Sequence, residues 1–257
     1  PNANILVTPA DHLILQEDVF DEAIRRSLEY VREHPKLVTL GVRPSRPETG
    51  YGYIQFTDAE EEHFVKVKTF TEKPNHEMAK VFYESGEFLW NSGMFAWNVR
   101  TILDAFNLHL PALTSVLDEA NGAYATPEEQ DRVGAIFSQC PNISIDYAVL
   151  EKADNVMVLP VDFGWADLGT WGSLYELKRE EPEANVALHT EALFYEAKGN
   201  IVSLDGDESE QLVVVQGIDD CIVAQSKGVL LICKRDQEQR IKEFMGDASE
   251  RYKKKFD

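Results

Sequence analysis

The sequence N-A-N-I-L-V-T-P-A-D-H at residues 2–12 decides the fold class. Its first seven residues are mostly apolar and predict a buried strand. Residues 18–33 carry apolar side chains at helical spacing, and residues 37–41 form a second apolar run. A strand, a helix and a strand in this order are typical of α/β folds. A buried strand needs a neighbour on each side, so we also expect residues upstream of Pro1 to belong to the same sheet.

The chain continues as α/β up to about residue 184. Proline, arginine and glycine in residues 42–51 predict a loop. Two β-type runs after this loop predict a strand pair around an acidic turn. The remaining elements are a strand that follows a turn within residues 89–98, a strand at 156–161, and helices at 77–84, 102–110, 128–137, 145–151 and from 168 to 177.

From residue 185 onward, short apolar runs alternate with glycine and aspartate, and helical periodicity disappears until residue 236. Gly206, Gly217 and Gly228 recur at a constant interval, which favours a small β-helix-like repeat, with an irregular β-sandwich as the alternative. A charged helix is predicted from residue 236 to about residue 252, followed by a basic cluster. We therefore predict an α/β domain in residues 1–184 and a β-repeat module that ends in a helix in residues 185–257.

The composition limits the partners. Hydrophobic residues make up 44% and charged residues 27% of the chain, as in ordinary globular proteins. The formal net charge of −20 disfavours nucleic acid and anionic lipid, and the longest apolar run is far too short to span a membrane. The three cysteines show neither disulfide nor zinc spacing, which predicts free thiols and a cytoplasmic protein.

Two aspartates are candidates for a metal site. Asp11 follows the first apolar strand, and Asp167 lies between two glycines after the strand at 156–161. Ligands of open α/β sheets gather at the carboxyl ends of strands. Mg²⁺ typically takes one or two carboxylates together with substrate phosphates. Each aspartate could instead begin a helix or a turn, and spacing alone does not show that the two meet.

Other polar residues are suited to a phosphorylated sugar. Glu72 and Lys73 end a predicted strand; the lysine can neutralise a phosphate, and the glutamate can accept hydrogen bonds from hydroxyls. Asn91 lies among aromatic residues, as in many sugar sites. An exposed ion pair and a buried turn are the respective alternatives. Nucleophile elbows, P-loops and dinucleotide-binding glycine motifs are absent.

The order and wording of these motifs resemble the mannose-1-phosphate guanylyltransferases. The matching segments are P-A-D-H at 9–12, E-T-G-Y-G-Y at 48–53, F-T-E-K-P at 70–74, W-N-S-G-M-F at 90–95, S-I-D-Y at 144–147 and D-F-G-W-A-D-L-G-T-W at 162–171. The resemblance spans nearly the whole chain. It implies a GT-A-like (Rossmann-like) α/β domain followed by a left-handed β-helix-like module.

The resemblance also implies a reaction and its residues. Mannose 1-phosphate and GTP would give GDP-mannose and pyrophosphate, with Mg²⁺ held by Asp11 and Asp167. Lys73 would bind the sugar phosphate, and Glu72, Asn91 and Gly52 would contact the mannosyl ring. Asp146 and Tyr147 match a family motif without a firmer role than support of the site. Small molecules are the expected partners, and the chain could also form a homodimer.

One family feature has no counterpart in residues 1–257. Members carry near their start a glycine-rich loop with an arginine and a Pro-Lys, which grips the triphosphate; the guanine contacts lie in the same region. We therefore expect about 100 further residues upstream, and we expect the chain alone to be inactive. The alternatives are a non-catalytic sugar-phosphate-binding relative and a nucleotidyltransferase for another sugar 1-phosphate.

Overall fold

The computed structural model describes residues 2–205 and 212–252, and only the backbone of residues 58–60. The chain forms two compact units. The first comprises Pro1–Ala10 and Ile14–Trp165, and the second comprises Asp11–Leu13 and Ala166–Asp257.

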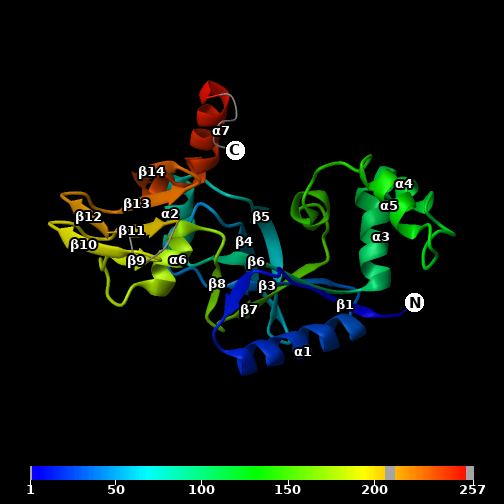
Figure 1. Ribbon diagram of the computed structural model, residues 1–257. Helices are drawn as coiled ribbons and strands as arrows, with labels where there is room; N and C mark the ends of the chain where they lie inside the picture. The colour runs from blue at the N-terminus through cyan, green and yellow to red at the C-terminus, as the bar shows by residue number, and fades with distance from the viewer. Residues whose placement is uncertain (1, 206–211, 253–257) are drawn as a thin grey trace. The chain divides into compact units, whose positions relative to one another are not determined.

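A mixed six-stranded sheet forms the centre of the first unit (Figure 1). Its strand order is β1-β6-β3-β7-β5-β4, and β4 also pairs with β6. β3 and β7 are parallel, whereas the other pairings are antiparallel. The strands are β1 (Asn4–Val7), β3 (Leu37–Val42), β4 (Tyr53–Glu61), β5 (Phe64–Thr71), β6 (Phe88–Asn98) and β7 (Val156–Val161).

Helices cover both faces of this sheet. Successive side chains of a strand point to opposite faces, so each central strand contributes residues to two apolar clusters, one on each face. One cluster takes Val38, Leu40 and Val42 from β3, and the other takes Leu37. All six residues of β3 are therefore buried. α1 (Glu17–Glu33) and α2 (His76–Ser85) pack on the first cluster; α3 (Val99–His109) and the π-helix η1 (Asp146–Leu150) pack on the second. α4 (Pro111–Asp118) and α5 (Glu129–Phe137) follow α3.

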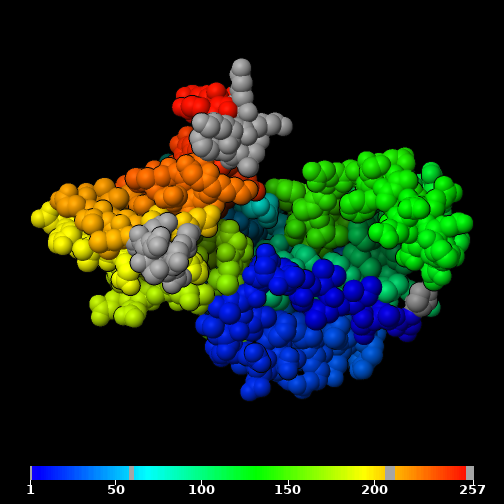
Figure 2. Space-filling model, in the orientation of Figure 1, coloured from blue at the N-terminus to red at the C-terminus, as the bar shows by residue number. Residues whose placement is uncertain are grey.

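The predicted strand-helix-strand unit is confirmed as β1, α1 and β3. Within the described residues, the first strand is less buried than predicted. In the described chain β1 is an edge strand that pairs with β6 alone, so Leu6 and Val7 are 36% and 42% exposed. Residues near the N-terminus, in blue, form a continuous part of the surface in the space-filling view (Figure 2). Residues 88–98 form one uninterrupted strand, and α4 was not predicted.

The second unit contains mostly short strands. β2 (His12–Ile14) pairs with β8 (Trp165–Asp167), and the division between the units falls within both strands. The following elements are α6 (Trp171–Lys178), β9 (Val186–Leu188), β10 (Glu191–Tyr195), β11 (Ile201–Leu204), β12 (Leu212–Gln216), β13 (Cys221–Ser226), β14 (Val229–Lys234), the 3₁₀ helix η3 (Arg235–Arg240) and α7 (Ile241–Tyr252).

Successive strands of this unit stack in parallel. β9, β11 and β13 pair in one sheet, β10 and β12 pair in another, and β14 turns back antiparallel to β13. Asn200 is fully buried between these strands. Its side chain donates to Asn185 Oδ1 and the Ile218 carbonyl and accepts from the Cys221 N–H, at 2.8–3.0 Å. Because both the amide nitrogen and the amide oxygen of Asn200 are hydrogen-bonded, this buried polar side chain stabilises the turns and does not destabilise the core.

Two of the three regularly spaced glycines lie in the described residues. Gly217 and Gly228 have φ of +69° and +80°, which glycine adopts without strain, while Gly206 lies outside the described residues. The compact units divide after Trp165, earlier than the predicted boundary after residue 184. Tyr175 of α6 packs on Val186 and Ile201, which explains why this helix groups with the strands. The boundary at residue 184 stays a prediction.

Candidate functional site

The residues predicted to contact a sugar come together on three neighbouring strands of the first unit. Gly52 directly precedes β4, Glu72 directly follows β5, and Asn91 lies in β6. β4 pairs with both β5 and β6, and its first residue, Tyr53, faces Thr71 and Trp90 in register. This register places Gly52 between Glu72 and Asn91, which are far apart in the sequence.

Gly52 provides the space for this arrangement. The N–H of Asn91 donates to the Gly52 carbonyl at 2.8 Å. A Cβ atom at position 52 would lie 2.5 Å from Glu72 Oε2 and 3.4 Å from Asn91 Cβ. A side chain at this position would therefore displace the Glu72 carboxylate.

Lys73 has an unusual backbone. Its φ is 45°, in the left-handed region that disfavours a residue with a Cβ atom, and Pro74 follows it. Such conformations cost on the order of 1–3 kcal/mol and cluster at functional sites. The Lys73 ammonium lies 3.5 Å from Glu72 Oε1, and its side chain is 60% exposed. The lysine thus has an exposed charge on a constrained backbone beside the Glu72 carboxylate.

The electrostatics of this cluster are dominated by carboxylates. Burial raises the pKa of Glu72, Lys73 opposes the rise, and the neighbouring Asp146 adds to it. Glu151, an exposed residue just after η1, also has a raised pKa, because of partial burial and then the charges of Asp146 and Glu72. Hydrogen-bond donors or cations from a ligand would stabilise the charged form of Glu72.

Asp146 reaches this cluster through Asn91. Asn91 Nδ2 donates to Asp146 Oδ1 at 2.8 Å, and Asn91 Oδ1 accepts from the Gly93 N–H at 3.2 Å. Asp146 is the first residue of η1, whose Ala148 and Val149 are buried against the sheet. The S-I-D-Y motif at 144–147 predicts only that Asp146 supports the site; the hydrogen bond to Asn91 is seen in the structure alone.

The loop before Gly52 is held by a buried carboxylate that sequence reasoning missed. Glu48 is 7% exposed; its carboxylate accepts from Arg46 at 2.9 Å and from the Gly50 N–H at 2.9 Å. The Glu48 N–H donates to the hydroxyl of Tyr53 at 2.9 Å. Because the glutamate is paired on both oxygens, it fixes the course of the chain into Gly52. Only its place in the E-T-G-Y-G-Y segment could have pointed to it.

Aromatic side chains from three of the sequence motifs pack together beside this loop. The Tyr51 ring lies 5.1 Å from the Trp90 ring and 5.0 Å from the Trp165 ring, both edge to face. Edge-to-face packing of this kind stabilises ring pairs beyond the burial of their area. The cluster gives the 48–53 loop a rigid apolar support.

The two aspartates lie in the second unit, one just before β2 and one in β8, the strand paired with it. Asp11 directly precedes β2, and Asp167 ends β8. Asp167 Oδ1 accepts from the Gly169 N–H at 2.8 Å and lies 3.8 Å from Nε2 of His12, the residue next to Asp11. The structure thus brings together two segments that are distant in the sequence.

Neither aspartate caps a helix. The residue before α1 is Gln16, and the cap of α6 is Thr170, whose hydroxyl accepts from the Ser173 N–H at 3.1 Å. In the described part of the chain, no group of three or more His, Cys, Asp or Glu side chains is arranged as a metal site. Two carboxylates that rely on substrate phosphates for further ligands are a donor set that fits Mg²⁺.

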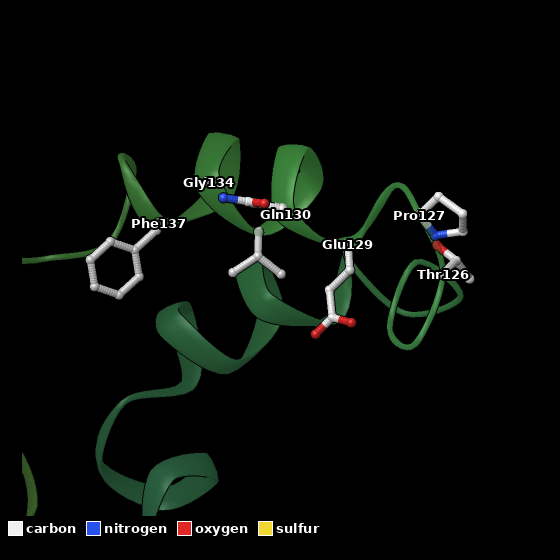
Figure 3. Close-up of a pocket in the computed structure, with 7 residues that line it drawn as sticks. Thr126, Pro127, Glu129, Gln130, Gly134 and Phe137 are labelled. Atoms are coloured by element: carbon white, nitrogen blue, oxygen red, sulfur yellow. The ribbon is translucent and has the colours of Figure 1, made fainter.

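The sugar-side residues therefore belong to the first unit and the two aspartates to the second. A separate hollow lies along α5 (Figure 3) and contains none of the predicted site residues. Its single carboxylate, Glu129, already accepts from the Ala125 N–H at 2.8 Å. Among the described residues, none of the helices is long and apolar enough to cross a membrane.

Comparisons with known proteins agree with the resemblance seen in the motifs. Residues 1–184 match the nucleotidyl transferase family. The chain is 37% identical over 243 residues to a mannose-1-phosphate guanylyltransferase of Escherichia coli (strain K12), covering 93% of this chain and 50% of that protein. It is 35% identical to mannose-1-phosphate guanylyltransferase ManC of Salmonella typhimurium, covering 93% and 49%. The chain thus spans about half the length of these relatives.

A solved structure is similar along almost the whole chain. The crystal structure described as mannose-1-phosphate geranyltransferase from Thermus thermophilus superposes with a TM-score of 0.79 at 32% identity. The match covers 96% of this chain and 70% of that one. The predicted resemblance to mannose-1-phosphate guanylyltransferases is confirmed, as is the mixed α/β nucleotidyltransferase fold. By sequence and by structure, the chain belongs to the nucleotidyl transferase family.

Proposed function

We propose that the protein transfers a guanylyl group to mannose 1-phosphate, giving GDP-mannose and pyrophosphate. The observation that carries this proposal is the convergence of three residues on paired strands: Gly52 before β4, Glu72 after β5 and Asn91 within β6, with Lys73 beside them. A carboxylate and an amide suit sugar hydroxyls, and an exposed ammonium suits a phosphate. The similarity to named mannose-1-phosphate guanylyltransferases supports the choice of sugar and base.

The proposed chemistry needs positioning rather than a covalent protein intermediate. An oxygen of the sugar phosphate attacks the α-phosphorus of GTP, the bond to the bridging oxygen breaks, and pyrophosphate leaves. In this scheme Glu72, Asn91 and Gly52 hold the ring, and Lys73 neutralises the sugar phosphate. The near-attack orientation of two bound reactants lowers the barrier by removing the entropy cost of their encounter.

Asp11 and Asp167 would hold Mg²⁺. The ion would neutralise the charge of the phosphates when bound. The pairing of β2 with β8, with Asp11 just before β2 and Asp167 as the last residue of β8, supports this assignment, because few protein ligands are needed when phosphates supply the others. The Gly169 N–H bond to Asp167 keeps one carboxylate oxygen in a fixed position.

Calorimetric titration of the 257-residue chain with mannose 1-phosphate tests the sugar half of the proposal. We expect saturable binding that Lys73→Ala weakens by roughly tenfold or more, since a hydrogen bond to a charged group contributes about 1.5–3 kcal/mol. Lys80→Ala is the matched control, because Lys80 is an exposed lysine of α2 paired only with Glu84 among the contacts seen. Equal affinity of both variants for mannose 1-phosphate would show that Lys73 does not bind the sugar phosphate. Absence of binding by the wild type would overturn the proposal.

The metal half is tested with Mn²⁺ as a paramagnetic probe of Mg²⁺ sites. Asp11→Asn and Asp167→Asn should each weaken Mn²⁺ binding in the presence of mannose 1-phosphate while leaving the unfolding curve almost unchanged. In a longer protein that contains this chain, the same changes should cut turnover strongly. A variant that keeps wild-type Mn²⁺ affinity and turnover would contradict the metal assignment.

Turnover by the chain itself is a separate prediction. No segment of residues 1–257 matches the glycine-rich triphosphate loop of the family. We therefore propose that these residues alone release negligible pyrophosphate from GTP and mannose 1-phosphate with Mg²⁺. Normal turnover in this assay would show that another part of the chain grips the triphosphate.

We also infer that residues 185–257 form a short β-helix-like module. Parallel stacking of β9, β11 and β13, parallel pairing of β10 with β12, and the buried Asn200 that bridges successive turns all support this interpretation. Repeat modules of this type bury a continuous core by stacking one turn on the next.

A further inference from the structure

The side-chain amide of Asn91 has partners at both ends. Its Oδ1 accepts from the Gly93 N–H at 3.2 Å and lies 3.3 Å from the Thr39 hydroxyl. Its Nδ2 donates to Asp146 Oδ1 at 2.8 Å. The backbone of Asn91 is fixed as well, because its N–H donates to the Gly52 carbonyl.

These partners determine which way the amide faces. A backbone N–H can only donate and a carboxylate can only accept, so Gly93 requires the amide oxygen and Asp146 requires the amide nitrogen. The Thr39 hydroxyl can serve either orientation and does not decide it. An amide nitrogen carries two hydrogens, and the bond to Asp146 uses one of them. Asn91 is thereby left as a hydrogen-bond donor toward a ligand.

Glu72 supplies the complementary acceptor. Its Oε2 and the Asn91 Cβ both border the same small volume above Gly52, at 2.5 Å and 3.4 Å from the position a Cβ atom would take there. One hydroxyl group can accept one hydrogen bond and donate another. A hydroxyl held beside Gly52 would therefore have the Glu72 carboxylate as an acceptor and the Asn91 side chain next to it.

Asp146 is anchored independently of the loops around the site. It begins η1, and the next turn places Ala148, Val149 and Leu150 in the apolar cluster beneath the sheet. The Glu151 N–H donates back to the Asp146 carbonyl at 2.9 Å. Short π-helical segments are rare and are frequently found at functional sites. The carboxylate is therefore presented to Asn91 from the core.

We propose that Asp146 is a positioning residue that holds the Asn91 amide as a donor, so that Asn91 and Glu72 together recognise one hydroxyl of the sugar. The hydroxyl oxygen accepts from Asn91 Nδ2, and its hydrogen is donated to the Glu72 carboxylate. This inference rests on the proposed function, since the sugar 1-phosphate occupies the same site. Asp146 itself does not need to touch the ligand.

The test measures discrimination as well as affinity. Mannose 1-phosphate and its 2-, 3-, 4- and 6-deoxy analogues are titrated into the 257-residue chain and into Asp146→Ala. We expect the wild type to bind one deoxy analogue at least tenfold more weakly than mannose 1-phosphate. Asp146→Ala should bind mannose 1-phosphate about tenfold more weakly and reduce that discrimination, because the amide then keeps only the Gly93 N–H as a partner that fixes its direction. Glu151→Ala removes a carboxylate next to the same short helix and should keep the discrimination.

Two further measurements separate positioning from a general structural effect. The effect of Asp146→Ala on affinity should disappear in an Asn91→Ala background; additive losses would overturn the inference. The side-chain amide signals of Asn91 in ¹H–¹⁵N spectra should shift in Asp146→Ala without ligand, and unchanged signals would also overturn it. If Asp146→Ala does not fold, the shape-preserving Asp146→Asn takes its place, with a shifted Asn91 amide as the expected result and unchanged amide signals as the contradicting one.

The outcomes also separate this inference from the proposed function. A wild-type chain that binds no sugar 1-phosphate contradicts the proposed function, while the ligand-free amide signals still report on Asp146. A wild-type chain that binds and discriminates, together with an Asp146→Ala variant that does the same, contradicts the positioning role alone.

Discussion

Gly52→Ala is the substitution that most clearly separates the sugar site from the stability of the fold. The added methyl group would lie 2.5 Å from Glu72 Oε2 and 3.4 Å from Asn91 Cβ. The first distance is too short, but the atom is the end of a side chain that can rotate. The φ of Gly52 is not in the left-handed region, so alanine can adopt the same backbone. The expected response is a displaced Glu72 carboxylate in an otherwise unchanged fold.

The magnitude follows from what the displaced carboxylate would have done. A hydrogen bond to a charged group contributes about 1.5–3 kcal/mol, so the loss of Glu72 from the site weakens mannose 1-phosphate binding roughly 10- to 150-fold. Replacing glycine by alanine restricts the unfolded chain and adds about 0.4–1 kcal/mol of stability. This gain offsets the cost of moving Glu72, and the net change in unfolding free energy should stay below about 1 kcal/mol.

Calorimetry and urea unfolding on the same samples provide the assay. If alanine acts through Glu72, Gly52→Ala should have little further effect on affinity in a Glu72→Ala background. Gly41→Ala is the contrasting control, because its Cβ would meet Val158 and Leu89 in the core at 2.6–2.7 Å. That variant should lose about 1–3 kcal/mol of stability. A Gly52→Ala protein with wild-type affinity, or one that unfolds as readily as Gly41→Ala, would refute the reasoning.

Three other predictions concern single residues. Asn200→Ala should destabilise the protein by about 3 kcal/mol in urea unfolding, because the buried Cys221 N–H and Ile218 carbonyl lose their partner; a loss under about 1 kcal/mol would contradict this. Gly134→Ala should raise stability by about 0.5–1 kcal/mol, since this α5 glycine has open space around its Cβ position; lower stability would be the opposite result. Burial raises the pKa of Glu72, so the folded state holds this proton more tightly than the unfolded chain does. The stability from this group is therefore greatest at low pH and falls as pH rises from about 4.3 through the folded-state pKa. Glu72→Gln should flatten that fall in unfolding curves measured across the same pH range, and parallel curves would contradict the prediction.

Periodicity predicted the elements that pack on one continuous surface. α1 carries a helical stripe of apolar residues and β3 a run of six buried ones, so both could be read directly. The exposure of β1 could not, because an apolar strand looks the same whether one or both of its edges are paired. α4 and β9 are too short for a period to emerge, and their formation depends on neighbours distant in the sequence.

The candidate site was predicted by residue type and motif, while its geometry depended on the fold. Glu72 and Asn91 were recognisable as sugar-binding types, yet their meeting across Gly52 depends on the pairing of β4 with both β5 and β6. The bond between Asn91 and Asp146 joins residues 55 positions apart. Glu48 looks like an exposed loop residue in the sequence, and only the folded loop shows that its carboxylate is buried and paired. Contacts of this kind depend on strand register and long-range packing, which a local pattern does not encode.

A structure of the protein soaked with mannose 1-phosphate tests the central claim most directly. We predict electron density for the sugar ring against Gly52, Glu72 and Asn91, with the phosphate next to Lys73 and one ring hydroxyl between the Asn91 amide and the Glu72 carboxylate. Density for the ligand in the hollow along α5, or a fully occupied ligand that leaves Glu72 and Asn91 without contact, would contradict the proposed site.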